Sequence, residues 1–303
     1  MEYYSGATLR PSPMPLLESA QSIDAAAADF AQPADNQFPS ASLVESVITL
    51  MREVSARELM PRFRHVYAEK KPDGSIVTDA DRAVEAVLAA ALPTLFDCPV
   101  LGEEMPEPEQ RRIWRDAEWC WCVDPLDGTG NFANGKRYFG ISVALMRDRR
   151  SVFGVVFDPN TGEAFHALRD GGAYLDGKRL KPGTTKYLAE ALVEAGRFKR
   201  LGRLGVALFE NRPFRKLSMS GASVLQWCHM ACGRVDAFVH AGEQPWDYAA
   251  GALILEEAGG RIATLHHDDY WRSDGTGEWA KSVIAARHPA LFDEWKRWVR
   301  NHL

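Results

Sequence analysis

The chain has 303 residues, of which 46% are hydrophobic, and carries a formal net charge of −5. A chain of this size can bury a sizeable core as one large or two smaller domains. Its basic runs are short and broken, so no nucleic-acid partner is expected, and no apolar run approaches the roughly 20 residues that span a bilayer. The N-terminus lacks the pattern of a secretory signal, which predicts a cytoplasmic protein with reduced thiols and no membrane partner.

The N-terminal part of the chain divides into an extension and two helical segments. Residues 1–40 are rich in Ala, Pro, Ser, Asp and Gln and show no sustained apolar face, so they are predicted to be disordered. A helical pattern begins near Ser42. After a polar loop a second helix is predicted, with Thr78 as its N-cap and Asp81 as the capping-box partner three residues on.

The remainder of the chain is rich in strands and then mixed. Between about residues 98 and 180, short β-prone runs are separated by turn signals. From about residue 190, strands and helices alternate, and Gly259-Gly260 is predicted to end a helix that begins at Asp247. These patterns predict a layered α/β or α+β body without internal repeats.

Carboxylates gather at three places where a strand ends or a helix begins. They are Glu103 and Glu104 in "LGEE", Asp124 and Asp127 in "DPLDGT", and Asp247 in "PWDYAAG". Taken singly, such residues are charged loops, turns or N-caps. Ligands in α/β proteins collect at these edges, however, and crowded carboxylates have raised pKa values unless a cation lies among them. An all-oxygen cluster favours a hard divalent ion, most simply Mg²⁺.

Four motifs in this order resemble those of one enzyme family, the inositol monophosphatase-like family of Mg²⁺-dependent, lithium-sensitive phosphatases within the sugar phosphatase superfamily. The motifs are "VTDAD" (77–81), "LGEE" (101–104), "VDPLDGTGNF" (123–132) and "WDYAAGALILEEAGG" (246–260). The resemblance covers about residues 42–300. It implies a layered α-β-α-β-α sandwich, with an α+β half at 41–189 that carries the metal motifs and an α/β half at 190–303 that completes the active site. Family members are commonly dimers, so a homodimer is expected.

The resemblance also implies a role for each matching carboxylate. Glu103, Asp124 and the backbone carbonyl of Leu126 would hold one Mg²⁺, and Asp124, Asp127 and Asp247 would hold a second. Two such ions can clamp an in-line phosphoryl displacement and activate the attacking water. Mn²⁺ is an alternative metal.

Two further features complete the implied catalytic machinery. Thr129 paired with Asp81 would orient and deprotonate the nucleophilic water, a task that would outrank the capping role of Asp81. The family's flexible basic residue, which lies near a weaker third metal, corresponds to Lys70 or to the neighbouring Lys71.

The implied substrate contacts match the family less closely. The amides of Gly128 and Thr129 would bind phosphate oxygens, and the small residues Gly221 and Ala222 would let a substrate approach the backbone. Asp247 would contact substrate as well as metal.

His240 stands where inositol phosphatases have a Glu that contacts sugar hydroxyls, and Ser218 stands where an Arg is common. Both departures weaken the case for inositol as substrate. His240 can bind a hydroxyl, bind a second anionic group if protonated, or simply form the pocket wall. A basic segment nearby either meets a second phosphate or is a solvated loop; its residues are Arg212, Arg215 and Lys216.

The function expected from these observations is hydrolysis of a small phosphate monoester, inositol monophosphate or a related polyol or sugar phosphate, by a metal-activated water. Alternatives within the family are histidinol-phosphate, fructose-1,6-bisphosphate and 3′-phosphonucleotide phosphatases. A haloacid-dehalogenase-type phosphatase needs Asp-x-Asp, whereas two residues separate Asp124 from Asp127. The non-enzymatic alternative is a regulatory binding protein on the same fold, because some bacterial relatives of the family act as binding factors.

Overall fold

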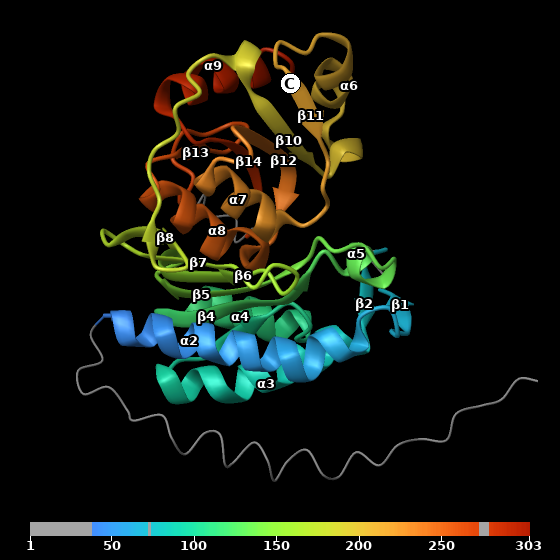
Figure 1. The fold of residues 1–303 in the computed structure, drawn as a ribbon, viewed down its shortest axis with the longest axis vertical. Helices are drawn as coiled ribbons and strands as arrows, with labels where there is room; N and C mark the ends of the chain where they lie inside the picture. Colours follow the sequence, from blue (N-terminus) through green and yellow to red (C-terminus); the bar gives the residue numbers. More distant parts are fainter. Residues whose placement is uncertain (1–37, 72–73, 273–278) are drawn as a thin grey trace, which may run out of the picture.

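The computed structural model describes residues 38–71, 74–272 and 279–303. Figure 1 shows helices and sheets stacked in five layers, which confirms the predicted α-β-α-β-α sandwich. The extension predicted to be disordered is residues 1–40, of which residues 1–37 lie outside the described residues, whereas Ser40 is the N-cap of α2. Every helix in the described ranges is too short or too polar to cross a bilayer.

The first layer consists of α2 (Ala41–Val54) and α3 (Asp79–Leu95). The predicted N-cap and capping box of α3 are confirmed, because Thr78 accepts from the first turn while its own backbone N–H donates to Asp81. A π-helical turn (Ser55–Leu59) and a 3-10 turn (Met60–Arg62) extend α2. The antiparallel hairpin of β1 (Ala68–Lys70) and β2 (Ile76–Thr78) then leads into α3.

The second layer is a seven-stranded sheet in the order β3-β4-β5-β6-β7-β8-β9, antiparallel except for the parallel pair β3–β4. Its strands are β3 (Val100–Gly102), β4 (Trp119–Asp127), β5 (Gly140–Arg147), β6 (Arg150–Phe157), β7 (Ala164–Leu168), β8 (Gly172–Leu175) and β9 (Lys178–Arg179). Helix α4 (Glu107–Asp116) joins β3 to β4, and the short α5 (Thr129–Ala133) follows β4. Helical layers cover both faces, so alternate residues of β4 contribute to two different cores: Trp121 faces α2 and α3, and Cys122 faces α7 and α8.

The middle layer holds α7 (Ser223–Cys232) and α8 (Pro245–Glu257) between the two sheets (Figure 1). Helix α8 is apolar on nearly every side, as a helix buried between two sheets requires. It begins at Pro245, two residues before the predicted start at Asp247, because proline is well suited to the first helical turn. As predicted, α8 ends just before Gly259-Gly260.

The fourth layer is a mixed five-stranded sheet in the order β11-β10-β12-β14-β13. Its strands are β10 (Leu192–Gly196), β11 (Lys216–Ser218), β12 (Ala237–Glu243), β13 (Arg261–Ala263) and β14 (Lys281–Ala286). Strand β10 pairs in parallel with both β11 and β12, so the carboxyl ends of these three strands share one edge. That edge faces the end of β4.

The fifth layer consists of α6 (Arg203–Glu210) and α9 (Pro289–Arg300), accompanied by 3-10 turns at Leu188–Glu190 and Phe198–Leu201. The two helices share a core with one face of the five-stranded sheet, and Trp295 is fully buried in it. The predicted boundary between residues 189 and 190 lies in the connection between the two sheets. The division into two domains stays a prediction.

Candidate metal and phosphate site

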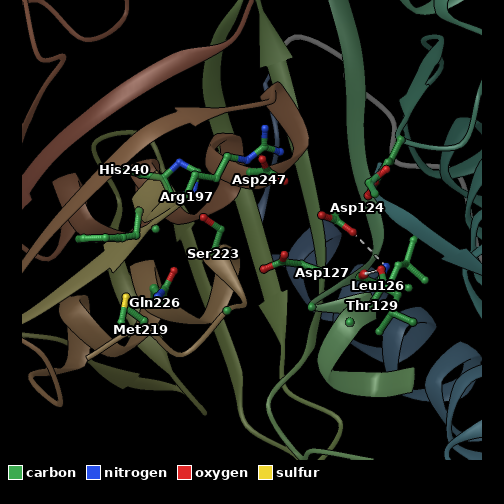
Figure 2. Close-up of a pocket in the computed structure, with 18 of the residues that line it drawn as sticks. Asp124, Leu126, Asp127, Thr129, Arg197, Met219, Ser223, Gln226, His240 and Asp247 are labelled. Atoms are coloured by element: carbon green, nitrogen blue, oxygen red, sulfur yellow. Dashed lines mark hydrogen bonds between the residues drawn. The ribbon is translucent and has the colours of Figure 1, made fainter. Parts of the chain in front are cut away.

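A cavity of about 400 Å³ opens where the end of β4 meets the ends of β10 and β12 and the first turns of α7 and α8. The side chains that face it are drawn in Figure 2. All the residues predicted to form the active site line this cavity except Asp81 and Ala222. Segments more than one hundred residues apart in the sequence therefore contribute to one site.

Three aspartates form the acidic side of the cavity. Carboxylate oxygens of Asp124, Asp127 and Asp247 lie within 4.8 Å of one another. The pairing of β4 with β5 shifts register between Asp124 and Asp127, so the strand bends where the two ligand candidates lie. Asp247 joins them from the first turn of α8.

Backbone N–H groups fix the orientation of each aspartate. Asp124 Oδ1 accepts from the N–H of Leu126 at 3.0 Å, and Asp127 Oδ2 accepts from the N–H of Val224 at 2.8 Å. Asp247 Oδ2 accepts at 2.8 Å from the N–H of the residue that caps α8. Because these bonds restrain one oxygen of each carboxylate, the other oxygens can converge on a shared cation.

The electrostatics of this cluster favour a cation. Burial first, and repulsion by Asp247 second, raise the pKa of Asp127 to about 8. Burial raises the pKa of Asp247 to about 6 and, together with Glu103, that of Asp124 well above its ordinary value. Such carboxylates must either take up protons or bind positive charge. Their all-oxygen donor set and spacing fit a hard divalent ion such as Mg²⁺.

Glu103 joins the site from the loop after β3 and is paired with a lysine. Lys71 Nζ lies 3.3 Å from Glu103 Oε1 and 2.6 Å from Glu104 Oε1. Burial raises the pKa of Glu103 to about 8, whereas the Lys71 charge lowers it. Lys70 is exposed on β1. The lysine that reaches the acidic cluster is therefore Lys71.

Thr129 connects the cavity to the buried Asp81. Its Oγ1 lies 3.0 Å from Asp81 Oδ1 and 2.9 Å from the carbonyl oxygen of Leu126, so its one proton has two possible acceptors. The other carboxylate oxygen of Asp81 accepts from the N–H of Thr78 at 2.8 Å. Helix capping and contact with Thr129 therefore use different oxygens of Asp81. Burial is the main reason that the pKa of Asp81 rises to about 6.

The small residues on the floor of the site have distinct tasks. Gly128 has φ of +86°, and a Cβ there would lie 3.0 Å from both the Cβ of Ala222 and the carbonyl oxygen of Tyr138. Only glycine satisfies both constraints without strain. Ala222 is buried behind this turn and does not line the cavity, whereas Gly221 does.

The environment of His240 bears on the three roles left open for this residue. Burial, aided by the nearby charges of Arg197 and Arg200, lowers the pKa of His240 to about 3, so the ring is neutral at pH 7. A neutral ring favours the hydroxyl-binding and pocket-wall alternatives for His240 over the alternative in which a protonated ring binds a second anion. The basic segment 212–216 is also outside the cavity, with its three charged side chains exposed, and Ser218 does not line the cavity either.

Sequence reasoning missed several residues that line the cavity, among them Arg197, Phe198, Met219 and Gln226. Arg197 belongs to one of the short, broken basic runs of the sequence, a pattern typical of solvated loops. The available signal was its position directly after a β-prone run, because side chains at the ends of parallel strands gather at one sheet edge.

Comparisons with known proteins agree with this geometry. The sequence profile of one protein family, described as the inositol monophosphatase family, matches residues 40–298. The chain is 36% identical over 212 residues to inositol monophosphatase 2 of Solanum lycopersicum, covering 66% of this chain and 78% of that protein. It is 34% identical over 246 residues to Nus factor SuhB of Escherichia coli K12, and the match covers 77% of this chain and 90% of that protein. A solved IMPase of Thermotoga maritima superposes with a TM-score of 0.73 at 28% identity, and the match covers 86% of this chain and 97% of that chain.

Proposed function

Because the chain belongs to the inositol monophosphatase family, we propose that it is a Mg²⁺-dependent phosphomonoesterase that hydrolyses a small phosphorylated metabolite. The observation that carries the proposal is the cluster of Asp124, Asp127 and Asp247, whose carboxylate oxygens lie within 4.8 Å of one another at the cavity. Three carboxylates this close, one of them buried and two half-buried, repel one another unless a cation lies among them.

The proposed metal ligands are the three aspartates with Glu103 and the carbonyl oxygen of Leu126. Mg²⁺ bound there would neutralise charge on the phosphoryl group and lower the pKa of a bound water. The number of ions, two or three, and the use of Mn²⁺ in place of Mg²⁺ belong to the same proposal.

The chain's own residues supply positioning and proton transfer. The amides of Gly128 and Thr129, at the turn from β4 into α5, are the proposed contacts for phosphate oxygens. Thr129 Oγ1 can accept a proton from the attacking water while it passes its own to Asp81 Oδ1 at 3.0 Å. With a pKa of about 6, Asp81 is ionised above neutral pH and can receive that proton.

The experiment that tests the proposal is phosphate release with Mg²⁺ from inositol 1-phosphate, fructose 1,6-bisphosphate, histidinol phosphate and 3′-phosphoadenosine 5′-phosphate. Each substrate is run with and without Li⁺, beside an Asp127→Asn control. Metal-dependent turnover that the variant lacks supports the phosphatase. The ranking of kcat/KM then decides among the polyol, sugar, histidinol and nucleotide alternatives.

A second candidate function is a regulatory binding role, because one relative at 34% identity is named a Nus factor. Folded protein that binds Mg²⁺ and releases phosphate from no substrate would favour this candidate over the enzyme. A homodimer, a cytoplasmic location and inhibition by Li⁺ are proposed from family membership alone. Sedimentation of the full chain tests the first of these.

A further inference from the structure

One wall of the cavity is cationic. Arg197, the residue that follows β10, lines this wall, and the ring of His240 beside it is neutral at pH 7. Among the cavity-lining residues that the structure describes, Arg197 is thus the one that carries positive charge. No hydrogen bond or ion pair to another described residue holds its guanidinium group. Its five N–H donors therefore remain available to a ligand.

The backbone around Arg197 is built to place it there. Its φ of +44° lies in the left-handed region, which side chains other than glycine rarely adopt and which is concentrated at functional sites. The preceding Gly196 lies so close to His240 that a Cβ at Gly196 would be 1.7 Å from the ring. Figure 2 shows the Arg197 side chain extending past His240 toward Asp247.

A carboxylate free to accept hydrogen bonds from the hydroxyls of a neutral polyol is missing from the same wall. At the position of His240, the family resemblance implies a Glu that contacts sugar hydroxyls in inositol phosphatases. Glu194, the nearest buried carboxylate on β10, already accepts from Ser220 Oγ and from Gln226 Nε2, each at 2.7 Å. This wall thus offers a guanidinium and a neutral imidazole, and it lacks a free carboxylate.

We propose that Arg197 determines specificity by binding a second anionic group of the substrate, a carboxylate or a phosphate. The preferred substrates are then phosphate monoesters that carry another negative charge, rather than neutral polyol phosphates. A guanidinium suits this task because it stays charged and binds either anion through two parallel hydrogen bonds. The inference rests on the proposed phosphatase function and narrows its substrate class.

The test compares substrates that differ in one group. Glycerol 3-phosphate and 3-phosphoglycerate differ only in a hydroxymethyl against a carboxylate, and fructose 1,6-bisphosphate adds the phosphate arm. In Arg197→Ala, kcat/KM for the doubly anionic substrates is expected to fall roughly 10- to 100-fold, mainly through KM, and for glycerol 3-phosphate less than about threefold. Arg197→Lys should recover part of the loss. Lys199→Ala, an exposed basic neighbour outside the cavity, should match wild type.

Two outcomes of these assays would overturn the inference. Equal losses on glycerol 3-phosphate and 3-phosphoglycerate would mean that Arg197 acts on the shared phosphate or on the metal site. An unchanged kcat/KM would mean that it binds nothing. If Arg197→Ala lowers kcat/KM only for 3-phosphoglycerate, the group that Arg197 binds is a carboxylate. If it lowers kcat/KM only for fructose 1,6-bisphosphate, that group is a phosphate.

A binding measurement separates this inference from the proposed function. Calorimetry with Mg²⁺ in an Asp81→Asn background measures affinity for the same ligand pair without relying on turnover. Tighter binding of 3-phosphoglycerate than of glycerol 3-phosphate, lost in Arg197→Ala, supports the inference even if wild type releases no phosphate. Absence of phosphate release would contradict only the proposed phosphatase function. Equal affinity for both ligands defeats the inference while leaving a phosphatase intact.

Discussion

The hydroxyl oxygen of Thr129 lies 3.0 Å from a carboxylate oxygen of Asp81, a residue 48 positions earlier in the chain. This contact joins the turn after β4 to the first turn of α3. It places a carboxylate with a pKa of about 6 directly behind the hydroxyl that faces the cavity. Asp81, which does not line the cavity itself, is therefore linked to it through the Thr129 hydroxyl.

Removing the Thr129 hydroxyl tests this connection. Thr129→Val keeps the shape of the side chain but interrupts the path from water to Asp81, so kcat should fall roughly 10²- to 10⁴-fold. Thr129→Ser retains the hydroxyl and should stay within about tenfold of wild type. Steady-state kinetics with saturating Mg²⁺ makes the comparison. Equal activity of the valine and serine variants would remove Thr129 from proton transfer.

The raised pKa of Asp127 predicts how the metal-free protein responds to pH. The ordinary value of 3.8 applies to the unfolded chain, and the folded value is about 8. Between these values the folded protein binds more protons, so the free energy of unfolding decreases as pH rises from about 4 to about 8. Asp127→Asn lacks this loss and should be more stable than wild type at pH 8.5 by roughly 1–3 kcal/mol.

Urea unfolding with chelator, repeated with saturating Mg²⁺, checks the prediction for Asp127. Added Mg²⁺ should stabilise wild type and leave Asp127→Asn much less changed, since a ligand that binds only the folded state adds to stability by mass action. A metal-free variant that is less stable than wild type at pH 8.5 would contradict the account of this cluster.

Lys71 should compete with the metal for Glu103. Its Nζ lies 3.3 Å from Glu103 Oε1, so a cation that binds there must displace the ammonium group. We expect Lys71→Met to bind Mg²⁺ roughly 3- to 10-fold more tightly at pH 9, where more of Glu103 is ionised. The matched control is Lys70→Met, on the exposed neighbour. Calorimetry measures both, and equal affinities for the two variants would show that Lys71 does not compete.

Gly154 tests the packing of the middle layer. A Cβ at this position of β6 would lie 2.8 Å from the Cα of Ala250 in α8, closer than side chains tolerate. Gly154→Ala should therefore lower the free energy of unfolding by about 1–3 kcal/mol. Ala250→Gly in the same background should restore little, because the nearest atoms belong to the backbone. Full recovery in the double variant, measured by urea unfolding, would place the clash in side chains instead.

Local signals explain why some parts of the structure could be predicted. The capping box of Thr78 and Asp81 involves neighbouring residues, and the bend between Asp124 and Asp127 lies within one continuous motif. Helical patterns in the sequence likewise predicted α2, α3 and α8. The predicted start of α8 differs from the observed start by two residues.

Non-local geometry explains the rest. Three-residue strands such as β11 and β13 are too short to show a recognisable alternation of apolar and polar residues. They form because neighbouring strands offer hydrogen-bonding partners. The choice between Lys70 and Lys71 depends on how a hairpin packs against a distant loop. Arg197 reaches the cavity because β10 and β12 run in parallel, a pairing that no short stretch of sequence encodes.

Hydrolysis is expected to require a metal held by Asp124, Asp127 and Asp247, and a Mg²⁺ titration of activity tests this requirement. Phosphate release is measured as Mg²⁺ is added to chelator-treated wild type, Asp124→Asn and Asp158→Asn, the last a buried aspartate outside the cavity. We expect Mg²⁺-dependent release by wild type and Asp158→Asn, and at least a roughly 10³-fold loss in Asp124→Asn. Release that needs no Mg²⁺, or that survives in Asp124→Asn, would contradict this expectation.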